Sequence, residues 1–261
     1  MRKLALVFVL LSFFYVSSFA VINIGVSGGY ASVAMTEVNK NLDKFENDMK
    51  NLGLSPSITK LGHGLYGNLD LNFGFIPFVN LGLRTGILYC FQGKTSIEGD
   101  LSLYDSRLAP IGTGTLSYTY DALLIPVMAG LGLSVGLPGI PFSINAGVYG
   151  GYGFSIVSEG GNIKSGSINI PFNPIYNGGG FVMDAGIGFS FSMLPFISAT
   201  LNIAYKLAKI PEVKATSDVG LGAPLNITIV KKDDILKGHD GNSLPIDYSG
   251  INVGVGINIG F

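Results

Sequence analysis

Residues 248–261 read YSGINVGVGINIGF, a pattern that few folds accommodate. Every second residue from Ile251 to Phe261 is bulky and apolar, and the residues between them are glycine or asparagine. This period of two indicates a β-strand with one large apolar face and one face of almost no volume. A flat soluble sheet gains little from the small face, because glycine packs against nothing. A narrow closed barrel explains both faces, since the small one points into a crowded lumen and the bulky one into lipid.

The composition agrees with a membrane barrel and argues against other classes. Only 13% of the 261 residues are charged, 48% are hydrophobic, and the mean hydropathy is +0.46, which excludes a disordered chain. The 38 glycines have no three-residue period, so the chain is not collagen-like. A formal net charge of −1 gives no reason to expect nucleic acid as a partner. The single cysteine, Cys90, excludes an internal disulfide and a cysteine-cluster metal site.

Residues 1–20 form a separate unit that predicts export. Arg2 and Lys3 precede an apolar core, and small residues end the segment at Ala20. This order is typical of a signal peptide cleaved after Ala20, and it leaves residues 21–261 as one barrel domain. The alternative, an N-terminal membrane anchor, requires a longer apolar run.

Period-two alternation recurs along the mature chain and predicts about eight antiparallel strands, an all-β transmembrane up-and-down barrel. The alternation slips near Pro126, which predicts a bulge there. One later segment, 225–230, is a possible extra hairpin arm, and ten strands is the count if that arm spans lipid. The predicted strands cover residues 21–33, 60–75, 79–92, 116–135, 142–156, a segment including 181–191, 196–208 and 248–261.

One segment follows a helical period instead. From Met35 to Leu52 the apolar residues are three and four positions apart, and Gly53 and Pro56 end the pattern. An amphipathic helix between the first and second strands normally buries its apolar face. Two placements are open: the helix plugs or caps the lumen, or it packs on a surface rim.

The predicted connections alternate in length. Three are tight and share a Pro-Phe pair, whereas the others are long and polar, including a predicted loop over 93–114. Ile170-Pro171-Phe172 has the same sequence inside a predicted outer loop, so position matters more than the motif. Short turns at one end and long loops at the other are typical of bacterial outer-membrane barrels, with the turns in the periplasm. The tight connections are Ile76-Pro77-Phe78, Ile140-Pro141-Phe142 and Leu194-Pro195-Phe196.

In these features residues 21–261 resemble small bacterial outer-membrane β-barrels of the OmpA/OmpX/opacity-protein type. The resemblance implies an outer-membrane location, contact with outer-membrane lipids and insertion by the barrel-assembly machinery. It also implies that the terminal aromatic, Phe261, is an assembly signal. The chain departs from the type in having no tryptophan, so its 17 Phe and 12 Tyr residues must form the interfacial girdles. The resemblance carries over no catalytic residue.

Proline-centred turns set the register of neighbouring strands and predict two ion pairs in the lumen. Asp70 and Arg84 are equidistant from Pro77, and Asp184 and Lys206 are equidistant from Pro195. Opposite charges directly across a ladder stabilise each other, and an isolated buried charge is costly. The pairs are therefore either a structural necessity or a gate or selectivity filter. Asp121 is a further inward candidate without an evident partner.

Nothing in the sequence indicates an enzyme, a cofactor or a metal. His63 falls on the lipid-facing side and His239 in the last loop, and neither has a nucleophile at a matching position. The sequence therefore predicts an integral outer-membrane barrel with a structural or surface-contact role through its outer loops. The alternative is a small gated pore or a ligand-binding barrel, with a lipid-modifying enzyme third.

Overall fold

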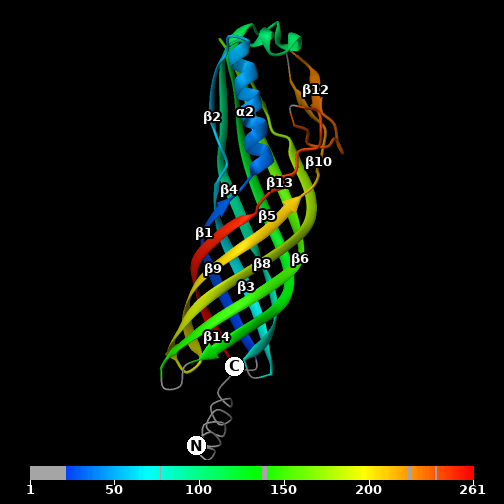
Figure 1. The fold of residues 1–261 in the computed structure, drawn as a ribbon. Helices are drawn as coiled ribbons and strands as arrows, with labels where there is room; N and C mark the ends of the chain where they lie inside the picture. The colour runs from blue at the N-terminus through cyan, green and yellow to red at the C-terminus, as the bar shows by residue number, and fades with distance from the viewer. Residues whose placement is uncertain (1–21, 77, 137–139, 223–224, 239) are drawn as a thin grey trace, which may run out of the picture.

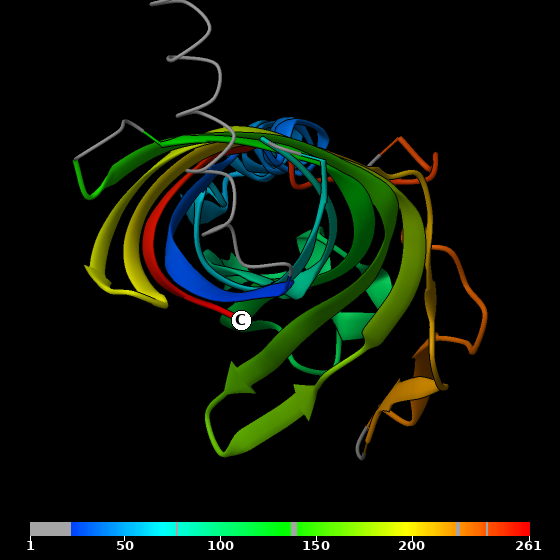
Figure 2. The same cartoon turned by 90° about the horizontal axis from the view of Figure 1, so that it is seen from below.

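The computed structural model describes residues 22–76, 78–136, 140–222, 225–238 and 240–261, and its body is a closed β-barrel (Figure 1). Eight strands form the ring, and each pairs antiparallel with both neighbours. The last strand pairs with the first along 11 residue pairs, which closes the ring seen from below in Figure 2. The predicted barrel of eight strands is confirmed. In ring order the strands are β1 (Ile22–Val33), β3 (His63–Ile76), β4 (Val79–Asp100), β5 (Thr113–Gly136), β6 (Phe142–Ser165), β8 (Ile175–Leu194), β9 (Ile197–Ile210) and β14 (Gly250–Gly260).

Tight connections and long ones lie at opposite ends of the barrel. The links β3–β4, β5–β6 and β8–β9 lie at the end that carries the C-terminus (Figure 1). Pro77 and residues 137–139 of these links fall outside the described residues. Ile170-Pro171-Phe172 lies in β7 (Ile168–Phe172), which pairs with the far end of β6. The tripeptide therefore occurs in a strand at the loop end as well as in turns.

Three neighbouring strands are the longest of the eight and, with the 20-residue β8 beside them, form a wall above the ring. β4, β5 and β6 have 22, 24 and 24 residues, whereas β1 and β14 have 12 and 11. The prediction of a loop over 93–114 is therefore wrong for its first part. Residues 94–98 instead continue β4 and pair with β2 (Ser55–Thr59). Thr95 and Ile97 are buried on the inner face of this extension. This alternation is hard to recognise in the sequence because the segment is mostly polar. β10 (Val213–Ala215) extends the wall beside β8.

Two further details differ from the sequence predictions. The arm at 225–230 forms β12 (Ile227–Val230), which pairs with β11 (Val219–Leu221) outside the ring, so the ten-stranded alternative is not adopted. The bulge predicted at Pro126 lies instead in β4, between Cys90 and Gly93. Pro126 keeps the β5–β6 register, and its carbonyl accepts a hydrogen bond from Thr85 Oγ1 at 2.9 Å.

The outward face of the ring is apolar all round. Val255 and Phe181 are each 66% exposed, and large apolar side chains on all eight strands are exposed in the same way. A continuous apolar surface around a closed barrel matches the hydrocarbon of a bilayer, so the ring is the membrane-spanning part. No helix in the described part of the chain has the length and apolarity needed to cross a membrane. The outward aromatics that stand in for tryptophan include Tyr30, Tyr89, Tyr152 and Phe154 towards the loop end and Phe73, Phe191, Phe196 and Phe261 towards the turn end.

The helix α2 (Thr36–Asn51) lies above this ring, beside β2 (Figure 1). It begins after Met35, whose N–H donates to the carbonyl of Asp247 just before β14. Met35 and Val38 line the same small void as Ala122 and Val157, which belong to the inner face of β5 and β6. The first turn of the helix therefore closes the mouth of the lumen, whereas Met49 near its end packs with Leu54, just before β2, and Ile97 of the extended β4, so α2 combines the two placements that the sequence left open.

Candidate functional site

The polar lumen contains both ion pairs that the turn-centred register predicts. Asp70 lies opposite Arg84 in the β3–β4 ladder, and Asp184 lies opposite Lys206 in the β8–β9 ladder. Arg84 Nε is 2.6 Å from Asp70 Oδ1, and Lys206 Nζ is 3.2 Å from Asp184 Oδ2. The Asp184 and Lys206 side chains are 1% and 2% exposed, so this pair is fully enclosed by the barrel.

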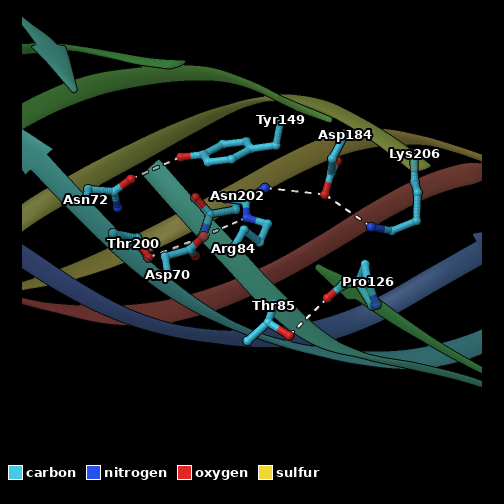
Figure 3. A network of polar contacts seen from close by, with 10 residues as sticks. All are labelled: Asp70, Asn72, Arg84, Thr85, Pro126, Tyr149, Asp184, Thr200, Asn202 and Lys206. Carbon is cyan, nitrogen blue, oxygen red and sulfur yellow. Dashed lines mark hydrogen bonds and ion pairs between the residues drawn. The ribbon is translucent and has the colours of Figure 1, made fainter. Parts of the chain in front are cut away.

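Arg84 joins the two pairs into one network across the lumen (Figure 3). Its Nη1 is 3.3 Å from Asp184 Oδ2, although β4 and β8 are not neighbours in the ring. Its guanidinium also lies 4.1 Å from the centre of the Tyr149 ring, whose hydroxyl donates to Asn72 Oδ1 at 3.1 Å. Two carboxylates and two cations thus neutralise each other, as buried charges require. Sequence reasoning missed this cross-link, because strand register relates only adjacent strands.

Towards the end that carries the long loops, an apolar layer fills the lumen. Leu88 and Leu124 are 1% and 0% exposed, and Tyr248, at the head of the closing stretch, is completely buried. The Tyr248 hydroxyl donates a hydrogen bond to the Leu123 carbonyl at 3.2 Å and accepts one from Ser155 Oγ at 2.7 Å. Tyr248 therefore reaches from the start of β14 to β5 and β6. Cys90 belongs to the same buried cluster and is a free thiol, as the single cysteine of the sequence requires.

Two polar side chains mark the outer edge of the apolar band. Asp121 is hydrogen-bonded to Tyr89, which is 40% exposed on the outside of the barrel, so the inward placement expected for Asp121 is wrong. β5 keeps one alternation without a bulge, with Ala122, Leu124 and Met128 buried on its inner face, so Asp121 lies on the outer face. His63 lies outside, as predicted, and hydrogen-bonds to the Tyr30 hydroxyl. His239 falls outside the described residues.

Above the apolar layer the wall, α2 and the last long loop surround a cavity of about 810 Å³, which we call the outer cup. The strands β4, β5 and β6 contribute inward side chains such as Thr95, Tyr118 and Glu159, and α2 contributes Leu42. Short 3₁₀ turns at Leu101–Leu103 and Ser106–Leu108 and the loop around residues 233–238 complete the rim. By contrast, the polar cavity in the lower lumen has a volume of about 140 Å³.

Aromatic rings form a continuous band along one side of the outer cup. The Tyr118 ring stacks near Tyr120, with centroids 6.5 Å apart, and meets Phe172 edge-on at 5.3 Å. Tyr104 is hydrogen-bonded to Tyr118 and meets Phe45 of α2 edge-on at 5.9 Å. Rings arranged in this way present both faces and edges to the cavity.

One carboxyl group lies at the floor of the outer cup. Glu159 is opposite Tyr120 in the β5–β6 ladder and accepts a hydrogen bond from Tyr176, which is 4% exposed. Burial raises the pKa of Glu159 to about 7, and the hydrogen bond from Tyr176 acts in the opposite direction. Among the residues that the structure describes, no cation forms an ion pair with Glu159. Sequence reasoning missed this site because it assigned residues 157–180 to a loop. The alternation of Leu116, Tyr118 and Tyr120 was the available signal that the strands extend this far.

Comparison with known proteins assigns no role to any residue of the outer cup. No family model matches the chain, and no curated protein matches it. Several solved outer-membrane proteins align along nearly its whole length. OprG from Pseudomonas aeruginosa covers 93% of this chain and 98% of its own, with 13% identity and a TM-score of 0.43. The Neisserial surface protein A covers 92% and 97%, with 7% identity and a TM-score of 0.36. A major outer membrane protein from Thermus thermophilus covers 91% and 99%, with 11% identity and a TM-score of 0.37.

Proposed function

We propose that this protein is a bacterial outer-membrane barrel whose membrane portion is a closed anchor and whose outer cup makes contacts at the cell surface. One observation carries the proposal: the large cavity lies above the apolar band, whereas the lumen within the band is occupied by side chains. An eight-stranded barrel has an interior just wide enough for side chains to fill. The barrel then holds the outer cup in place, and specificity belongs to the cup.

The protein's own cysteine allows a direct test of this orientation. Cys90 is completely buried, so a membrane-impermeant maleimide leaves the native chain on intact cells unlabelled. We expect Lys232→Cys, in the exposed loop of the outer cup, to be labelled on intact cells. The matched variant Ser192→Cys, exposed at the turn end, is expected to be labelled only after the cells are broken. The reverse pattern contradicts a cup that faces the outside.

A gated pore is the second candidate, and the polar lower cavity with its charge network favours it. Planar bilayers distinguish the two. We expect no regular single-channel steps from the native protein, because Leu88, Leu124 and Tyr248 fill the lumen. We expect steps from Leu124→Ala combined with Tyr248→Ala, and none from Tyr205→Ala, which changes only the outer face. Regular steps from the native protein favour the pore.

The remaining partners follow from the same proposal. Outer-membrane lipids surround the apolar band, and the barrel-assembly machinery inserts the chain by reading its last strand. Phe261 is 73% exposed and its N–H donates to the Ile22 carbonyl at 2.8 Å, so its side chain is free to act as the assembly signal. Deletion of Phe261 tests that role through the assembled fraction in cells. We propose contact by binding, without catalysis or a cofactor.

A further inference from the structure

We propose that the outer cup binds a small organic cation with an apolar body, held by the Glu159 carboxylate and the tyrosine rings around it. This inference rests on the proposed function, since it requires the cup to face the outside. The ligand class is an amine, guanidinium or quaternary ammonium compound. Three independent observations lead to it: the charge of the cup, its aromatic band and its volume.

The first observation is the charge that the cup leaves without a counterion. Four carboxylates and two cationic side chains line the described cavity, a formal charge of −2. Asp105 and Arg107 pair with each other at the rim. Glu159 lies deeper, and its described partner is the neutral phenol of Tyr176, which donates a hydrogen bond to it. A half-buried carboxylate in an apolar and aromatic setting is costly without a cation, and a bound cation removes that cost.

The second observation is the set of rings beside this carboxyl. Tyr120 lies opposite Glu159, Tyr118 is next along the same inward face, and Phe172 packs against Tyr118. A cation within about 6 Å of a ring face is attracted by the negative charge density there. Rings also bury the apolar body of an organic cation, which a hydrated metal ion lacks. Together the carboxylate and the rings select a cation that carries carbon.

The third observation is size. Small-molecule sites usually occupy about 300–1,000 Å³, and the outer cup, at about 810 Å³, falls within that range. The lumen below offers no comparable space, because its cavity is about 140 Å³. The cup therefore admits a compact organic molecule and ends at the buried cluster that includes Tyr248.

Calorimetric titration of the full-length protein in detergent with benzyltrimethylammonium tests the proposal. This probe is permanently charged, so its own state does not change with pH. We expect Glu159→Gln to weaken binding about tenfold or more, and Tyr118→Leu to weaken it several-fold. The matched control Glu98→Gln, exposed on the outer side of β4, is expected to bind like the native protein. Benzyl alcohol, which has the ring without the charge, is expected to bind far more weakly.

The pH dependence gives a second readout. Because the carboxylate form binds the cation, affinity is expected to fall from about pH 8 to about pH 5.5 as Glu159 takes up a proton. The cup also contains the phenols of Tyr104, Tyr118, Tyr120 and Tyr176 and the charged groups of Asp105, Arg107, Asp233, Asp234 and Lys237. Glu159→Gln removes the titration of Glu159 and leaves all of these groups in place, and we expect it to abolish the pH dependence of binding.

Two results overturn the inference. One is the absence of binding to the native protein at about 10 mM probe, a concentration that detects even a weak site. The other is equal binding by Glu159→Gln and the native protein, which assigns the affinity to apolar contact alone. Either result leaves the cysteine-labelling pattern intact if the cup faces outward, so failure of the ligand class is distinguishable from failure of the proposed function.

Discussion

Replacing Arg84 with methionine is expected to lower the free energy of unfolding by about 3 kcal/mol or more. The substitution keeps an apolar stem of similar length but removes a cation that contacts both Asp70 and Asp184. Asp184 retains Lys206, whereas Asp70 is left in the lumen without its partner. Removing one member of a buried ion pair is costly mainly because the other charge stays buried. Urea titration of the barrel in lipid vesicles measures the change.

Two controls make this result specific. Arg84→Met combined with Asp70→Asn removes the unpaired charge and is expected to recover most of the lost stability. Arg107→Met breaks an ion pair whose arginine is 59% exposed, and such surface pairs contribute about 0–1 kcal/mol. If the double variant is no more stable than Arg84→Met, the loss arises from packing against Tyr149 and not from the unpaired Asp70.

Gly29→Val is expected to prevent or severely weaken closure of the ring. Gly29 faces Gly254 across the β1–β14 seam. A Cβ at position 29 would lie 2.1 Å from the Val253 carbonyl oxygen and 2.5 Å from the Gly254 Cα, both of which are backbone atoms. Backbone cannot move aside as a flexible side chain does, so the expected cost exceeds the usual overpacking range of about 1–3 kcal/mol. Heat-modifiable mobility on gels measures the folded fraction.

Gly67→Val is the matched control. Gly67 lies on the neighbouring strand β3, and the nearest atoms to a Cβ there are 3.9 Å away, which is ordinary contact distance. Valine at this position adds apolar surface to the lipid side and is expected to fold like the native chain. Normal folding of Gly29→Val would show that the seam is wider than the structure has it.

The barrel was predictable from sequence because its determinants are local. Period-two alternation gives each strand its two faces, and a tight turn fixes the register of the strands that it joins. Asp70 therefore falls opposite Arg84, and Asp184 opposite Lys206. The contact of Arg84 with Asp184 depends on the curvature of the closed ring, which no adjacent pair of strands reveals.

The outer cup was not predictable for a different reason. Thr95 and Ile97 continue the inward face of β4, but charged and small residues surround them, and polar composition is also typical of loops. Glu159 gains its importance only when Tyr120 and Tyr176 on the neighbouring strands are placed beside it. Long strands that leave the membrane thus look like loops when hydrophobicity is the criterion.

The contacts at the start of α2 connect the order of synthesis to the order of assembly. The N–H groups of Ala34 and Met35 donate to the carbonyls of Ser249 and Asp247, and Tyr248 between them lies in the lumen. These hydrogen bonds join the end of the first strand to the segment just before the last strand. The helix is therefore not fixed in place, and the cup is not closed below, until the last strand has been added. A chain that stalls before β14 is inserted therefore has no finished cup, so the proposed binding site forms only when the barrel is complete.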